Sequence, residues 1–78
     1  MISFDVDGLF NYAPNTYCSN DGIIDTYATV LEANGACSND GQCDAVVDFK
    51  CDGPPFHTCQ GTVKTSTKGS CTWEKIGT

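Results

Sequence analysis

Six cysteines and one histidine are the residues of this chain whose types are best suited to chemistry. The cysteines are Cys18, Cys37, Cys43, Cys51, Cys59 and Cys71. Cysteines in such numbers bind zinc or pair as disulfides. A structural zinc site uses closely spaced ligand pairs of the Cys-x-x-Cys kind, whereas successive cysteines here are separated by 18, 5, 7, 7 and 11 residues. The spacing therefore favours disulfides and predicts neither a metal nor a cofactor.

Disulfides also suit the size of the chain. A domain of 78 residues buries little apolar surface and usually needs covalent links to be stable. An even number of cysteines allows all of them to pair, but the sequence does not choose among the connectivities. Cysteine use of this density is typical of oxidising compartments. We therefore expect a secreted, extracellular protein in its mature form, because the first residues lack the basic and apolar segments of a signal peptide.

Charge is unevenly distributed along the chain. Residues 1–49 contain eight acidic residues and no basic one, whereas residues 50–78 contain four lysines and two acidic residues. Nucleic acids and anionic membranes are bound by strongly basic surfaces, which a net charge of −6 without arginine does not provide. No apolar run is long enough to span a membrane. We expect neither partner and interpret the acidity as favouring solubility; the alternative is an acidic surface for a basic partner.

Catalysis would require a nucleophile beside a base, usually with a third group that orients the base. His57 is the only histidine and lies in a proline-containing stretch where a solvated surface role is expected. Paired cysteines offer no thiol. The eight aspartates and two glutamates include candidate carboxylate pairs, but so small a domain seldom forms the deep cleft that raises a carboxyl pKa. The sequence therefore predicts that the protein is not an enzyme.

The segment between Cys51 and Cys59 is the best candidate for a binding surface, and it contains Pro54, Pro55, Phe56 and His57. If these two cysteines pair, they close a ring of nine residues that the prolines stiffen, so that binding orders less chain. Such a ring resembles the reactive loop of Bowman-Birk protease inhibitors, and the resemblance implies protease inhibition. The alternative is a rigid surface connection between strands. Phe56 is the predicted exposed anchor.

Several stretches have the alternation of apolar and polar residues that is typical of strands with one buried face. They are residues 2–7, the shorter 9–12 and residues 43–50, where Cys43, Ala45, Val47 and Phe49 are expected on one face and Asp44, Asp48 and Lys50 on the other. Residues 62–65 and 70–75 are rich in β-branched side chains and are separated by a glycine-containing turn. They predict a hairpin near the carboxyl end.

Residues 23–33 fit two structures. Ile24, Tyr27 and Leu31 have helical spacing, with Asp25 as a candidate N-cap and Asn34-Gly35 as a candidate stop. The many β-branched residues in the same stretch favour a strand, which is the interpretation preferred here. The predicted fold is a single small disulfide-rich domain over residues 1–78 that is mainly β, a compact sandwich or barrel. The alternative is an α+β fold with one or two short helices, including residues 25–33.

A short motif, Cys-Ser-Asn-Asp-Gly-x-x-Asp, occurs at residues 18–25 and again at residues 37–44. Asn, Asp and Gly favour tight turns, so each copy predicts a turn that enters a strand and is tethered by its cysteine. An EF-hand calcium loop does not fit either copy, because the first and twelfth positions of that frame carry no carboxylate.

The mature size, the six cysteines and the abundance of small polar residues resemble the small secreted cysteine-rich proteins of filamentous fungi. These include effectors, elicitors and killer-toxin-like proteins. Residues 23–37 are similar to the helix-then-cysteine segment of smut-fungus killer-toxin subunits, which are α/β sandwiches, and this similarity implies a helix at 25–33. The resemblance implies a monomer that binds an extracellular host protein or glycan, with antimicrobial toxicity as another alternative.

Overall fold

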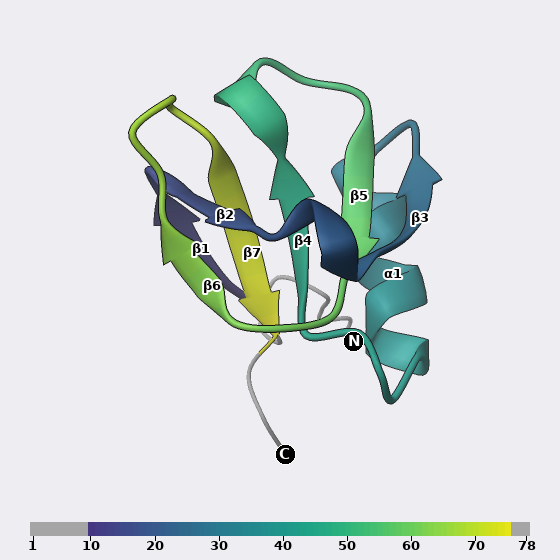
Figure 1. Ribbon diagram of the computed structural model, residues 1–78. Helices are drawn as coiled ribbons and strands as arrows, with labels where there is room; N and C mark the ends of the chain where they lie inside the picture. Colours follow the sequence, from purple (N-terminus) through teal and green to yellow (C-terminus); the bar gives the residue numbers. More distant parts are fainter. Residues whose placement is uncertain (1–9, 76–78) are drawn as a thin grey trace.

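The computed structural model describes residues 10–75, so the strand expected at residues 2–7 lies outside the described residues. Within that range the chain forms seven strands, one α-helix and two 3-10 turns (Figure 1). In chain order these are β1 (Phe10–Pro14), β2 (Thr16–Cys18), η2 (Asn20–Gly22), β3 (Ile23–Tyr27), α1 (Val30–Asn39), β4 (Ala45–Asp48), η3 (Phe49–Cys51), β5 (Phe56–Cys59), β6 (Val63–Thr65) and β7 (Cys71–Lys75). The expected small, disulfide-rich and mainly β fold is confirmed, and it includes one short helix, which only the alternative expectation contained.

The strands form two antiparallel sheets, and the helix adds a third layer. The larger sheet has five strands in the order β1-β7-β4-β5-β3, and β2 pairs with β6 in a separate ribbon. Helix α1 packs against β3, β4 and β5, whereas β2 packs against β4 and β7. Figure 1 shows β2 crossing the face of the larger sheet. The larger sheet is therefore covered by the helix on one face and by the β2–β6 ribbon on the other.

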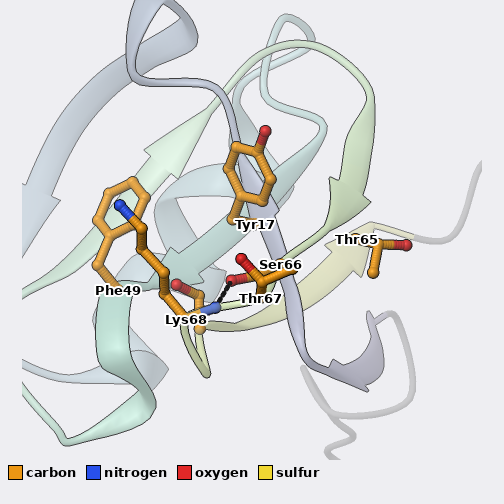
Figure 2. A pocket seen from close by; sticks show the side chains of 7 residues that line it. Tyr17, Phe49, Thr65, Ser66, Thr67 and Lys68 are labelled. Carbon is orange, nitrogen blue, oxygen red and sulfur yellow. Dashed lines mark hydrogen bonds between the residues drawn. The ribbon is translucent and has the colours of Figure 1, made fainter.

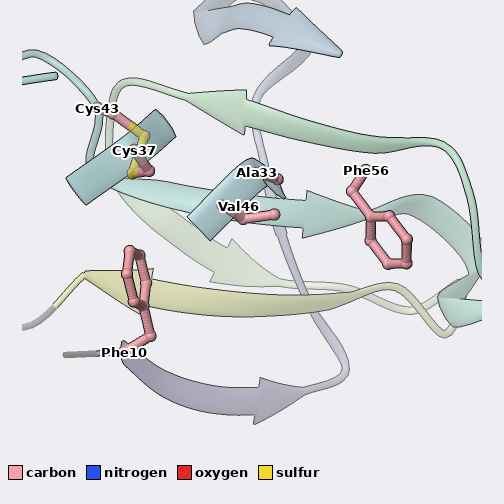
Figure 3. Packing of buried hydrophobic residues seen from close by; sticks show 6 residues of the cluster. All are labelled: Phe10, Ala33, Cys37, Cys43, Val46 and Phe56. Carbon is pink, nitrogen blue, oxygen red and sulfur yellow. A yellow bond between two sulfur atoms is a disulfide. The ribbon is translucent and has the colours of Figure 1, made fainter. Parts of the chain in front are cut away.

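Two hydrophobic clusters fill the spaces between these layers. The cluster on the helix side contains Phe10, Ala33, Cys37, Cys43, Val46 and Phe56. Figure 3 shows Phe10 near the Cys37–Cys43 disulfide and Phe56 toward the other end of the sheet. The cluster on the ribbon side contains Cys18, Ala45, Val47 and Cys59. Successive residues of a strand point to opposite faces, so the central strand β4 supplies both clusters.

Because β4 is covered on both faces, the one-sided pattern predicted for residues 43–50 is partly wrong. Ala45, Val47 and Phe49 do contact the same cluster. Cys43 precedes the strand and joins the helix-side cluster instead. Asp48 is only 4% exposed, and its carboxylate accepts a hydrogen bond from the backbone N–H of Gly53 at 3.0 Å. A buried carboxylate needs such a partner.

Residues 23–33 contain both of the structures that their sequence allows. The β-branched first half forms β3, which confirms the strand, but the preference for a strand is wrong from Val30 onward. Thr29 is the N-cap, and its hydroxyl accepts from the N–H of Glu32 at 3.1 Å. The expected cap, Asp25, lies within β3 and accepts from the N–H of Thr26. The expected stop at Asn34-Gly35 does not end the helix, which continues to Asn39 and thereby buries Cys37 against the sheet.

The hairpin predicted over residues 62–75 does not form. Strand β6 pairs with β2, whereas β7 lies between β1 and β4 in the other sheet. The connection between them is bonded to the corner that joins β1 to β2: the N–H of Ser66 donates to Asn15 O at 2.8 Å, and the N–H of Thr16 donates to Ser70 O at 3.1 Å. These hydrogen bonds fix the connection to residues 15 and 16. The chain therefore passes from the ribbon to the larger sheet, and β6 does not pair with β7.

All six cysteines form disulfides, as predicted, in the pairs Cys18–Cys59, Cys37–Cys43 and Cys51–Cys71. The predicted possibility of a ring closed by Cys51 and Cys59 is therefore wrong. Alternation along β5 turns Cys59 toward the ribbon, where Cys18 lies. Cys51 belongs to η3, which contacts β7, and so it meets Cys71.

Candidate functional site

The binding segment that the sequence predicts at residues 54–57 is only partly exposed in the structure. Pro54 and Pro55 are exposed. Phe56 is not an exposed anchor, because it is only 9% exposed and packs edge-on against Trp73 with 5.9 Å between ring centroids. His57 is half-buried, and its Nδ1 lies 3.0 Å from the hydroxyl of Thr26. The alternation of β5 explains this: one face of the strand is buried against the helix.

An open cleft lies elsewhere, where the β2–β6 ribbon meets the connection from β6 to β7. Its volume is about 350 Å³, and it is lined by Tyr17, Phe49, Thr65, Ser66, Thr67, Lys68 and Ser70. We call it the hydroxyl-lined cleft. Figure 2 shows the rings of Tyr17 and Phe49 on two sides of it, with the Ser66–Lys68 turn beneath them in this view. Three segments far apart in the sequence thus build one concave surface.

The two aromatic walls are fixed by the core beneath them. Tyr17 in β2 and Phe49 in η3 both pack against the cluster that surrounds the Cys18–Cys59 disulfide. The ring of Phe49 also contacts the imidazole of His57, with 5.5 Å between centroids. His57 is itself hydrogen-bonded to Thr26. The predicted site residue His57 therefore packs against the wall residue Phe49, although it does not itself line the cleft.

Hydroxyl groups form the base of the cleft. Ser66 and Ser70 are both buried. The hydroxyl of Ser66 accepts from the N–H of Lys68 at 3.0 Å, and that of Ser70 accepts from the N–H of Lys50 at 3.4 Å. A serine that accepts one hydrogen bond can still donate its own proton. Each buried serine therefore has a hydroxyl proton that these hydrogen bonds do not use.

One of the four lysines of this acidic chain lines the cleft. Lys68 lines it, Lys50 follows the wall residue Phe49, and Lys64 precedes the lining residue Thr65. The fourth lysine, Lys75, is engaged elsewhere: its ammonium donates to Cys37 O at 2.9 Å and to Asp40 O at 3.1 Å. None of the seven lining residues is acidic. The lining of the cleft thus carries a single positive charge, on a protein of net charge −6.

Part of the cleft is visible in the sequence as a run of hydroxyl-bearing residues. The run Thr-Ser-Thr-Lys-Gly-Ser at residues 65–70 predicts a hairpin turn when read alone. Four of its hydroxyl-bearing residues line the cleft together with Lys68. Because the aromatic walls come from residues 17 and 49, only the folded chain reveals the site.

The repeated motif has the structural role predicted for it. The first copy turns through η2 into β3, and the second leads from the end of α1 into β4. These two strands flank β5, and both Ile23 and Ala45 lie opposite Cys59. The two copies therefore enter the sheet at the same level on either side of one strand.

Asp48, Cys51 and Cys71 bring potential ligand atoms within 4.8 Å of one another. Both cysteines belong to one disulfide, and metals bind thiolates. We therefore interpret this group as part of the disulfide-linked structure and not as a metal site.

Comparisons of the chain with protein-family models, curated proteins and solved structures gave no match. The class of the protein is therefore defined by its own fold and site: a small β-rich domain with three disulfides, one helix and an open, hydroxyl-lined cleft. In the described part of the chain, no helix has the length and apolar character needed to cross a membrane.

Proposed function

We propose that this protein is a secreted, effector- or elicitor-like binding protein that recognises an extracellular host protein or glycan through the hydroxyl-lined cleft. The observation that carries the proposal is the composition of that cleft: two aromatic walls, a base of hydroxyls and one lysine. Binding sites combine apolar contact area with a few placed polar groups in this way. Its volume of about 350 Å³ falls within the usual range of ligand sites.

Rigidity of the site supports a role in binding. Tyr17 and Phe49 pack on the cluster that contains the Cys18–Cys59 disulfide, and Ser66 and Ser70 are tied through backbone hydrogen bonds to residues 15 and 16. A surface held in advance loses less conformational freedom when it binds. The disulfides also support an extracellular location, because they persist in oxidising surroundings.

The other functions predicted from the sequence are less well supported. Inhibition of a protease through a ring of residues 51–59 depended on a disulfide between Cys51 and Cys59, and these cysteines have other partners. We do not carry that function forward. Antimicrobial toxicity is kept as an outcome of the test below.

The test is retention of the protein by extracellular material from candidate hosts. Purified protein is incubated with isolated plant cell walls and extracellular fluid, and the bound fraction is measured; leaf infiltration then tests for a response. Thr67 lines the cleft and is exposed, so Thr67→Trp should fill the cleft and abolish retention. Thr62→Trp, at an exposed position that does not line the cleft, is the matched control and should bind normally.

Equal retention of the two variants would show that the cleft is not the binding surface. Absence of retention and response across a broad host panel would overturn the proposal. If the protein instead inhibits the growth of competing microbes, it is a toxin and the proposed function is wrong.

A further inference from the structure

We propose that the ligand of the hydroxyl-lined cleft is an acidic sugar, a pyranose ring that carries a carboxylate. This inference rests on the proposed function and names the chemistry that the cleft would recognise. The aromatic walls would contact the C–H face of the sugar, the hydroxyls at the base would bond its hydroxyls, and Lys68 would pair with its carboxylate.

The aromatic walls fit a pyranose. The face of an aromatic ring carries partial negative charge, and the C–H groups on one face of a sugar ring carry partial positive charge. Tyr17 and Phe49 both line the cleft, and Figure 2 shows their rings apart from each other. Their contact would supply apolar area to a ligand that is otherwise hydrophilic.

Hydroxyl groups on the protein match hydroxyl groups on the ligand. Thr65, Ser66, Thr67 and Ser70 make up four of the seven lining residues. Each hydroxyl both donates and accepts, as sugar hydroxyls do. Ser66 and Ser70 each accept from a backbone N–H group, and these hydrogen bonds do not use their own hydroxyl protons.

The charge of the cleft favours an anionic sugar. Lys68 is the one charged lining residue, and in Figure 2 its side chain extends along the Phe49 side. A lysine recognises an anion as a point charge, and the chain has no arginine that could form a bidentate pair with a carboxylate or a phosphate. The lack of a lining carboxylate disfavours a cationic ligand.

The test compares sugars that differ only in the carboxylate. Backbone N–H resonances of ¹⁵N-labelled protein are followed by NMR during titration with glucuronic acid against glucose, and galacturonic acid against galactose. We expect shifts confined to residues 65–70 and to Tyr17 and Phe49, and dissociation constants on the order of 1 mM because the site is open and small. Each acid should bind about two- to fivefold more tightly than its neutral partner, as an ion pair with the exposed Lys68 implies.

Three variants at two lysines separate direct contact from general charge. Lys68→Ala should abolish the preference for the acid, and Lys68→Arg should restore most of it. Lys64→Ala removes the same charge from an exposed lysine that does not line the cleft, and it should retain most of the preference. The dispersion of the NMR spectrum confirms that each variant is folded before its binding is interpreted.

Several results would overturn the inference. These are equal binding of acidic and neutral sugars, equal losses from Lys64→Ala and Lys68→Ala, displacement of the sugar by acetate alone, or tighter binding of a sulfated than of a carboxylated sugar. The proposed function fails separately. Retention by host material without a preference for acidic sugars overturns only the inference, whereas binding of acidic sugars without retention by any host material overturns only the proposed function.

Discussion

At the scale of single residues, the two copies of the repeated motif show that tertiary contacts decide whether a position requires glycine. Gly22 and Gly41 hold the same position in the two copies. A side chain on Gly22 would overlap the carbonyl of Gln60, whereas a side chain on Gly41 would meet nothing within 4 Å. The N–H of Gln60 also donates to Gly22 O at 2.8 Å. Only the first glycine is therefore required by close contact between backbones.

This difference gives a prediction with an internal control. Gly22→Ala should lower the free energy of unfolding by about 1–3 kcal/mol, the usual cost of overpacking a filled site. Gly41→Ala, in the identical local sequence, should change it by less than about 0.5 kcal/mol. Urea unfolding with the disulfides intact measures both. Equal effects of the two variants would mean that the contact between residues 22 and 60 does not constrain the fold.

At the scale of elements, helix α1 is tied to the sheet at both of its ends. Thr29 caps its first turn, and the Cys37–Cys43 disulfide joins its last turn to the approach to β4. The ammonium of Lys75, in β7, donates to Cys37 O and Asp40 O. Carbonyls at the end of a helix carry partial negative charge. Cys37 O and Asp40 O already accept from the N–H groups of Asp40 and Cys43, so the lysine from the sheet adds a second, charge-assisted hydrogen bond to each.

Replacement of Lys75 tests this contact. Lys75→Met keeps most of the apolar stem but removes the charge, and we expect a loss of about 1 kcal/mol in the free energy of unfolding. Lys64→Met, at an exposed position of β6, serves as the control and should cost less than about 0.5 kcal/mol. Denaturant unfolding at low and high salt distinguishes the charge from the packing. A loss that is the same for both lysines would argue against the contact.

At the scale of the whole molecule, the disulfides link different parts of the fold. Cys18–Cys59 joins the β2–β6 ribbon to the larger sheet across 41 residues of sequence, whereas Cys37–Cys43 spans 6. A disulfide restricts the unfolded chain more when it closes a longer loop. The long link also lies beneath the aromatic walls of the cleft, so it should matter for binding as well as for stability.

Paired removals test the importance of the long link. Cys18→Ala/Cys59→Ala should lower the free energy of unfolding by about 4 kcal/mol, against about 2 kcal/mol for Cys37→Ala/Cys43→Ala. Both pairs are almost fully buried, so the packing losses are comparable. Thermal unfolding ranks the two variants. The opposite order of the two melting temperatures would contradict the assignment of the long disulfide as the main link between layers.

Several features of this protein were determined by local sequence alone. The number and spacing of the cysteines indicate disulfides, and Asn-Asp-Gly turns lead into β3 and β4 as predicted. The β-branched residues before Tyr27 form a strand. Such features depend on composition and on neighbours within a few residues, and the sequence displays those directly.

Only the tertiary structure decided which distant segments meet. The pairing of Cys59 with Cys18, the separation of β6 from β7 and the burial of Phe56 each depend on how the ribbon and the helix cover the two faces of one sheet. The hydroxyl-lined cleft is of the same kind, because residues 17, 49 and 65–70 come together only when β2 pairs with β6. Strand periodicity specifies that a face is buried, but not which element buries it. The sequence alone therefore indicated a disulfide-linked β domain, and the fold placed its candidate binding site.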